Sequence, residues 1–257
     1  MGKQAGQRGK DAADRAAETR KRILEAALKE FSAKGLAGAR TEQIAAAAGV
    51  NKALLYYYWD SKEKLYAAAL EAVATTVREN TLAVLRREGS AGERVIRAAL
   101  NHFDRILTQR EFQSLMQHEM MRLHKGEKGA LAVLVERIFR PLQLSFQATV
   151  REGVESGELI EGDLLQFQLT MLGANVFYFL SAPVWRMLLD VDPFSAPALK
   201  QRRVALVQFL GQAVFSDRKR GARLAEKVLK DMPAPAMRDL GLRRYGETTS
   251  KRRGKSE

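Results

Sequence analysis

The chain has 257 residues, of which 46% are hydrophobic and 28% charged, and these proportions exclude a wholly disordered protein. It contains no cysteine, which excludes a disulfide scaffold and thiolate catalysis. The formal charge is +13, which makes an acidic partner plausible on electrostatic grounds. The first residues carry charge without an apolar centre, so we expect no secretory signal and a cytoplasmic protein.

The excess positive charge lies at the two ends of the chain. Residues 1–70 carry 13 basic and 8 acidic side chains, residues 71–215 carry 17 and 16, and residues 216–257 carry 13 and 6. Basic ends attract nucleic acid, because each phosphate contact releases condensed counterions. The alternative is that both ends are simply solvated tails.

In chain order, almost every periodic segment has the spacing of a helix, which predicts an all-α fold. Residues 1–18 are rich in Gly, Ala and charge and predict a flexible basic arm. A first helix runs from about Glu18 to Lys34 and ends at Gly35, since glycine tolerates the left-handed conformation. Its apolar stripe consists of Ile23, Ala26, Ala27, Leu28 and Phe31.

Two short helices and a long one are predicted next. The short helices cover about 41–48 and 52–59, and Gly49 interrupts the chain between them. Ser61 is a suitable N-cap for the long helix, which covers about 61–87.

Beyond residue 90 the sequence predicts five helices, near 92–109, 111–124, 129–155, 163–190 and 197–215. Pro141 and Pro183 lie inside helical patterns and should kink or divide those helices. An amphipathic segment covers about 217–231, but the basic composition that follows predicts that residues 216–257 are a largely disordered tail.

The most apolar stretch, Leu169 to Leu189, approaches the length of about 20 residues that a membrane span needs. It is interrupted by Thr170, Asn175, Ser181, Pro183 and Arg186. We therefore expect a buried helix and no membrane partner.

The most informative segment is Arg40–Leu65. Two short helices joined by a tight turn that contains glycine predict a helix-turn-helix, whose second helix can enter the DNA major groove. Small side chains, Ala45 and Ala48, allow the helices to cross closely. The small core between them is filled by Ile44, Val50 and Leu55.

The second short helix has two distinct faces. At 100° per residue, Leu55 and Trp59 share the face that must point inward. The residues expected to point outward or to the flanks are Lys52, Ala53, Leu54, Tyr56, Tyr57 and Tyr58. Three consecutive tyrosines cover too wide an arc to be buried together, so at least one faces solvent or a partner. Tyrosine suits DNA, because its hydroxyl reaches phosphates and its ring packs on sugars and thymine methyls.

This segment resembles the DNA-binding domain of the TetR family of bacterial transcriptional regulators. The residues that match the family pattern are Thr41, Ile44, Ala45, Ala48, Gly49, Val50, Leu55, Tyr56, Tyr58, Trp59, Ser61, Lys62, Glu63 and Leu65. The resemblance covers residues 19–66, with the motif at about 40–59. It implies a three-helix DNA-binding domain over 19–66 and a larger helical domain for effector binding and dimerisation over 67–215.

The resemblance also implies roles in DNA binding. The expected contacts to the DNA backbone are made by Thr41, Tyr56, Tyr58 and Lys62, and the expected base-facing residues are Lys52, Ala53, Leu54 and Tyr57. The family often has Gly-Thr where this chain has Ala53-Leu54, so one hydroxyl is missing. We therefore expect base recognition to be more apolar than is usual in the family.

In proteins that this chain resembles, the larger domain binds a small effector and forms a two-fold dimer. The last two helices usually make the interface, which corresponds to 163–182 and 197–215, where apolar side chains recur at Phe167, Met171, Phe177, Phe179, Val204, Val207, Leu210 and Val214. Candidates for the effector pocket are Met116, His118, Met120, Arg122, Phe139, Phe146, Gln168, Met171, Asn175, Phe177, Tyr178 and Trp185. Methionine-rich linings favour an apolar or aromatic effector. Both sets could instead be ordinary core.

Metal binding and catalysis find little support in the sequence. The run of His118 to Arg122 has arginine where a zinc protease would need its second histidine. The chain has no Gly-x-Ser-x-Gly elbow and no P-loop. We expect no metal, no cofactor and no enzyme.

Three hypotheses for function follow. The leading one is a homodimeric repressor that binds a double-stranded DNA operator and is released by a small hydrophobic effector. The second is a protein that coats nucleic acid without sequence preference through its basic ends. The third is a small-molecule-binding module whose helix-turn-helix no longer recognises DNA.

Overall fold

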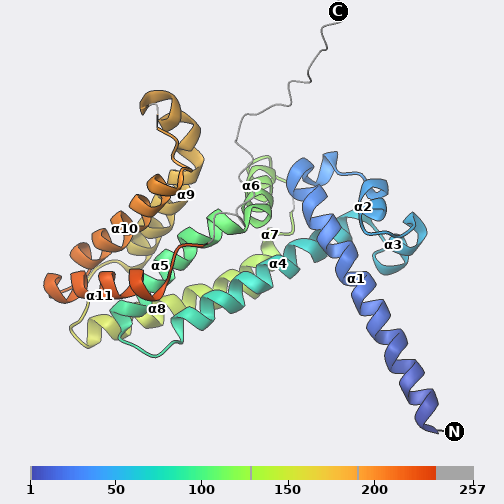
Figure 1. Ribbon diagram of the computed structural model, residues 1–257, viewed down its shortest axis with the longest axis horizontal. Coiled ribbons are helices and arrows are strands. Elements are labelled where there is room, and N and C mark those ends of the chain that lie inside the picture. The colour runs from blue at the N-terminus through green and yellow to red at the C-terminus, as the bar shows by residue number, and fades with distance from the viewer. Residues whose placement is uncertain (1, 128, 190, 236–257) are drawn as a thin grey trace, which may run out of the picture. The chain divides into compact units, whose positions relative to one another are not determined.

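The computed structural model describes residues 2–127, 129–189 and 191–235 (Figure 1). The described residues form helices and no β-strand, and one isolated antiparallel bridge pairs Leu159 with Phe215. The expected all-α fold is therefore confirmed. The helices are α1 Gly2–Gly38, α2 Thr41–Ala47, α3 Lys52–Tyr58, α4 Lys62–Leu85, α5 Ala91–Thr108, α6 Arg110–His124, α7 Leu131–Leu134, a π-helical turn η1 Val135–Phe139, α8 Arg140–Glu155, α9 Leu164–Leu189, α10 Ala196–Ala213 and α11 Arg218–Asp231.

The described chain divides into two compact units. The first unit takes residues up to 82 and 109–144, and the second takes 83–108 and the residues from 145 onward. This division differs from the expected boundary at residue 66. The physical reason is that α6 packs against α1, and its side chains Phe112, Leu115 and Met116 join the core of the first unit.

Helix α1 supplies one wall of the first core. Its side chains Ile23, Ala27 and Phe31 are fully buried, and Phe31 meets the Tyr66 ring edge to face at 5.0 Å. Each such large apolar side chain contributes about 1.5–3 kcal/mol when it is fully buried. Burial of this stripe fixes the two short helices against α1.

Both ends of α1 can be compared with expectation. The helical conformation is interrupted at Gly35, where φ is 66°, which agrees with the expected end. At the other end, the helix extends back to Gly2 through the segment that we expected to be a flexible arm. The described side chains over 11–18 are exposed, so helix propensity and local hydrogen bonds hold this part, without a core.

The helix predicted over 129–155 continues through Pro141, and only a π-helical turn just before that residue interrupts the α-helical pattern. The structure places α7, the π-helical turn η1 and α8 in this range, and η1 ends one residue before Arg140-Pro141. Proline has no N–H to give to the preceding turn, and a π-turn is one way to absorb the mismatch. Pro183 has a weaker effect, since α9 continues through it to Leu189.

Helix α5 forms the centre of the second core, with Val95, Ile96, Leu100 and Phe103 buried against the helices that follow. One turn of α5 also carries a polar network. Arg97 is 2% exposed and donates to Glu93 Oε1 at 2.7 Å and to Asp231 of α11.

The same network includes Lys227 of α11, which donates to Glu93 at 2.7 Å. Burial alone would raise the pKa of Glu93, but hydrogen bonds from Lys227 and Arg97 outweigh that effect and lower it. The carboxylate therefore stays ionised and joins α5 to α11.

Helix α11 corrects the expected tail. We predicted that residues 216–257 are largely disordered, but Ala225 and Val228 of α11 are buried in the second core. Two glycines allow this packing: a Cβ built on Gly221 would lie 1.9 Å from the carbonyl oxygen of Gly211. The rest of the predicted tail, residues 236–257, lies outside the described residues.

Helix α9 corrects a second expectation. We predicted a buried helix, yet only 17% of its most apolar window is buried in the chain. Its exposed apolar side chains are Leu165, Leu169, Phe177, Leu180, Val184, Trp185, Met187, Leu188 and Leu189. Among the described residues it is the one helix whose length and composition would suffice to cross a membrane. A single chain therefore leaves this apolar face uncovered.

Candidate nucleic-acid interface

The turn between α2 and α3 depends on Gly49. Its φ of 65° lies in the left-handed region. Residues that have a Cβ adopt this region only with steric strain. The Gly49 N–H donates to the Ala46 carbonyl at 3.1 Å, and the Val50 N–H donates to the Ala45 carbonyl at 3.0 Å. This pair of bonds is a Schellman motif, which ends α2 and starts the turn. The prediction that Gly49 makes the turn is confirmed.

Asn51 caps the N-terminus of α3. Its side-chain oxygen accepts a hydrogen bond from the Leu54 N–H at 2.7 Å. We did not predict this cap, although Asn directly before a short helix is among the strongest N-cap signals. The cap fixes the first turn of α3, where three of the expected base-facing residues lie.

The inner and outer faces of α3 agree with the helical-wheel prediction. Leu55 and Trp59 are buried, and the guanidinium carbon of Arg20 lies 5.2 Å from the centre of the Trp59 ring. Tyr57 is 79% exposed, which makes it the most prominent side chain of the motif. The other outward residues are Lys52 and Ala53, which are exposed, and Leu54, Tyr56 and Tyr58, which are half-buried.

Thr41 and Tyr56 lie together at the junction of α2 and α3. The Thr41 hydroxyl is 3.3 Å from the Tyr56 hydroxyl, and Thr41 is buried. The Thr41 side chain is thus engaged inside the protein. The N-terminal amides of α2, which begins at this residue, remain the groups by which the helix can bind a phosphate.

Lys52 is held near Tyr56 at the start of α3. Its ammonium lies 5.9 Å from the centre of the Tyr56 ring and forms an ion pair with Glu42 of α2. The hydrogen bond from Lys52 lowers the pKa of Glu42, and the same bond raises the pKa of Lys52. Both groups are exposed, so this ion pair is easily exchanged for another anion.

Lys62 lies in a different environment from the other predicted DNA contacts. Its ammonium donates to the carbonyls of Ala37 and Ala39, at 3.3 and 3.0 Å. These bonds satisfy the end of α1, so Lys62 has a structural contact inside the first unit. Ser61, by contrast, fulfils its predicted role, since its hydroxyl accepts the Lys64 N–H at 3.1 Å and caps α4.

The twelve candidate effector residues are divided between the two units. The first unit contains Met116, His118, Met120, Arg122 and Phe139, and the second contains Phe146, Gln168, Met171, Asn175, Phe177, Tyr178 and Trp185. Several already have partners: Arg122 pairs with Glu119 at 2.8 Å, and Tyr178 donates to the Pro193 carbonyl at 2.6 Å.

Asn175 of α9 is buried and donates to the Ala99 carbonyl at 3.1 Å. Its amide nitrogen also lies 3.2 Å from His102 Nδ1. Burial, assisted by the charge of Arg105, lowers the pKa of His102 to about 3. The imidazole is therefore neutral near pH 7, and its Nδ1 can accept the hydrogen bond from Asn175.

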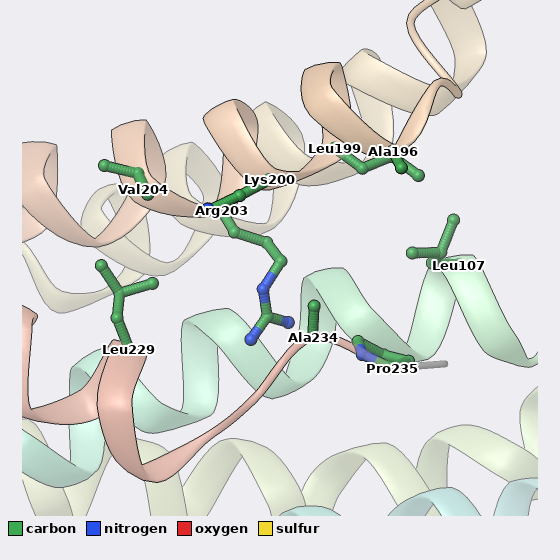
Figure 2. Close-up of a pocket in the computed structure, with 9 residues that line it drawn as sticks. All are labelled: Leu107, Ala196, Leu199, Lys200, Arg203, Val204, Leu229, Ala234 and Pro235. Atoms are coloured by element: carbon green, nitrogen blue, oxygen red, sulfur yellow. The ribbon is translucent and has the colours of Figure 1, made fainter. Parts of the chain in front are cut away.

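Each unit contains a cavity of a size that suits a small molecule. The cavity in the first unit has a volume of about 440 Å³, and His118 and Arg122 contribute to its wall. The cavity in the second unit has a volume of about 350 Å³ and is formed by α5, α10, α11 and the segment after α11 (Figure 2). None of the twelve candidate residues lines this second cavity.

Comparison with known proteins identifies both regions of the chain. Residues 23–69 match the family of bacterial regulatory proteins called tetR, and residues 92–210 match the tetracyclin repressor-like C-terminal domain. The transcriptional repressor NicS of Pseudomonas putida is 30% identical over 171 residues, which are 65% of this chain and 77% of that relative. The repressor SCO4008 of Streptomyces coelicolor is 51% identical over 53 residues, 21% of this chain and 28% of that relative.

Solved structures share the fold. A candidate transcriptional regulator from Saccharomonospora viridis, crystallised with choline, gives a TM-score of 0.60 at 18% identity, covering 78% of this chain and 100% of the other. A gamma-butyrolactone receptor gives 0.54 at 19% identity, covering 84% and 100%. The helix-turn-helix, the matched larger domain and the aligned repressor agree with one another. The chain belongs to the TetR family of bacterial transcriptional regulators.

Proposed function

We propose that the protein is a cytoplasmic, homodimeric repressor that binds an operator through α3 and is released from it by a small effector. The observation that carries this proposal is the outer face of α3. There Tyr57 and Lys52 project from a helix that Leu55 and Trp59 hold from behind. A rigid short helix with exposed hydrogen-bonding side chains has the properties required for reading bases in the major groove.

The proposed DNA contacts follow from the solvent exposure of the side chains of α3. Lys52, Ala53 and Tyr57 face base edges, and Leu54 packs on a thymine methyl group, in the place where a hydroxyl is common in the family. Tyr56 and Tyr58 on the flanks, together with the amides at the start of α2, bind phosphates. Lys62 supports this arrangement from inside the protein through its bonds to the end of α1.

The proposed dimer uses the exposed face of α9. A row of uncovered Leu, Phe, Val, Trp and Met side chains on a folded chain marks a surface that another apolar surface covers. Phe209 of α10, 60% exposed, adds to this surface. A second copy would supply the matching face by two-fold symmetry and would place two α3 helices at half-sites about one DNA turn apart.

Fluorescence anisotropy with the DNA that flanks the protein's coding sequence tests the assignment of α3. At about 150 mM salt we expect that duplex to bind about a thousandfold more tightly than a scrambled one. Lys52→Ala together with Tyr57→Ala should remove most of this preference without unfolding the protein. The matched control, Lys64→Ala, removes an exposed lysine outside α3 and should leave it unchanged. Full preference in the double variant would refute the role of α3.

A further inference from the structure

The cavity in the second unit is mostly apolar and has a defined wall. It is lined by Leu107 of α5, one face of the first turns of α10, Leu229 of α11, and the segment that follows α11. The residues from α10 and from that segment are Ala196, Leu199, Lys200, Arg203, Val204, Ala234 and Pro235. Figure 2 shows the Arg203 side chain entering between Leu229 and Ala234. A volume of about 350 Å³ with few polar groups is typical of a small-molecule site.

Arg203 makes the inner wall of this cavity rigid and polar. It is 3% exposed, forms an ion pair with Asp104 and donates to the Met232 carbonyl at 2.5 Å. Burial raises the pKa of Asp104, while the guanidinium of Arg203 opposes that shift. The Arg203 charge is thus balanced within the protein.

Lys200 gives the cavity its net charge. It is exposed at the edge of the lining, and among the described residues it forms no ion pair. Because Asp104 balances Arg203, the ammonium of Lys200 leaves one positive charge beside an apolar space. A ligand with an apolar body and a single negative group is complementary to this arrangement.

We propose that this cavity binds a small amphipathic carboxylate and that this molecule is the effector. Its apolar body lies against Leu107, Leu199 and Leu229, and its carboxylate lies beside Lys200. The inference rests on the proposed function, since it names the site and chemical class of the effector. The site involves α10, one of the helices expected at the dimer interface, and Leu107, which lies two residues before the chain passes into the first unit. Binding there can therefore couple to the dimer and to α6.

Calorimetric titration of the full chain with decanoate tests the site. We expect saturable binding of decanoate and no comparable binding of decyltrimethylammonium, which has the same chain with the opposite charge. Lys200→Glu reverses the charge at the cavity, and Ala234→Trp fills it from an exposed position. Each variant should weaken decanoate binding about tenfold or more.

Two controls keep this test specific. Lys219→Glu changes an exposed lysine of α11 that does not line the cavity and should leave the affinity unchanged. Ala213→Trp places the same large side chain at an exposed position of α10 that does not line the cavity, and it should also leave the affinity unchanged. Absence of saturable decanoate binding, or equal affinity in all four variants, would overturn the proposal.

A separate titration distinguishes this inference from the proposed function. Binding to the flanking DNA is measured without decanoate and then with it. A lack of DNA preference without decanoate contradicts the repressor, while the calorimetric result still decides the site. If the DNA preference is present and decanoate bound in the cavity leaves it unchanged, the effector role is overturned.

Discussion

Helices α3 and α9 both expose large side chains in the single chain, but the chemistry of the two surfaces differs. The α3 surface presents tyrosine hydroxyls and an ammonium group, with a buried face behind it. The α9 surface presents nine exposed apolar side chains. An exposed polar face is solvated by water and can remain exposed until DNA binds, whereas an exposed apolar face favours association with another apolar surface. We therefore propose the first surface for DNA recognition and the second for assembly of the dimer.

The largest expected effect comes from placing charge on the α9 surface. Phe177→Asp with Leu180→Asp replaces side chains that are 61% and 62% exposed. If a second copy covers them, the dimer dissociates and operator affinity falls by about 10²–10⁴-fold, since each subunit then binds one half-site alone. Sedimentation velocity measures the mass, and anisotropy measures the affinity.

The control for this prediction is Met120→Asp, which charges an exposed apolar residue of α6 in the first unit. It should leave both mass and operator affinity unchanged. A dimer that survives both substitutions on α9 would show that assembly uses another surface.

A second comparison sets the inner face of α3 against its outer face. Leu55→Ala empties a fully buried position and should lower the free energy of unfolding by about 2–5 kcal/mol. Tyr57→Ala should change it by no more than about 0.5 kcal/mol, because the side chain is exposed. Urea unfolding of the two variants measures the difference. Equal destabilisation would mean that Tyr57 packs in the folded protein.

His102, which contacts Asn175 of α9, makes the free energy of unfolding depend on pH. Its pKa in the folded chain, about 3, lies below the unfolded value of about 6.5, so the unfolded chain binds the proton first. The corresponding stability is complete above pH 6.5 and decreases as the pH falls toward 3. Between pH 7 and 5.5 the expected loss is about 1 kcal/mol.

The variant His102→Gln isolates this contribution, because glutamine keeps a polar group near Asn175 without titrating. The difference in unfolding free energy between the variant and the unmodified chain should change by that amount over this pH range. A constant difference would show that His102 does not titrate as its burial implies.

The smallest expected effect is a difference in the salt dependence of DNA binding between variants of Lys52 and Lys62, both of which the motif assigns to DNA contacts. Lys52→Met should reduce the slope of log K against log salt by about one per subunit, because a positive charge that lies in the major groove close to the phosphates is lost. Lys62→Met should leave the slope unchanged and cost about 1 kcal/mol of stability, since its bonds go to the carbonyls of Ala37 and Ala39. The same slope in both variants would contradict this assignment.

The DNA-binding motif could be predicted nearly to the residue because its signals are local. Gly49 ends α2 because its φ is positive. Leu55 and Trp59 are enough to define the inner face of α3, because the helix is short. The contact of Lys62 could not be predicted, since phosphate oxygens and backbone carbonyls both accept hydrogen bonds from ammonium. Asn51 could have been found from its position alone.

The second unit was harder to predict because its determinants are distant in sequence. The amphipathic pattern over 217–231 indicated α11, but not that it packs in the core, because its place depends on contacts such as that between Gly211 and Gly221. The sequence pattern of α9 indicated an apolar helix, but it did not indicate whether the apolar face packs against the same chain or against another one. The cavity beside Arg203 combines residues from three helices, and no local pattern brings them together.

Selection of bound duplexes from a randomised pool, with the full chain at about 150 mM salt, tests whether α3 recognises a specific DNA sequence within a symmetric dimer. We expect enrichment of an inverted repeat whose half-sites are centred about one helical turn apart, and loss of that enrichment with Lys52→Ala and Tyr57→Ala. Recovery of bound DNA with no shared sequence would refute this role of α3 and would favour a protein that coats nucleic acid.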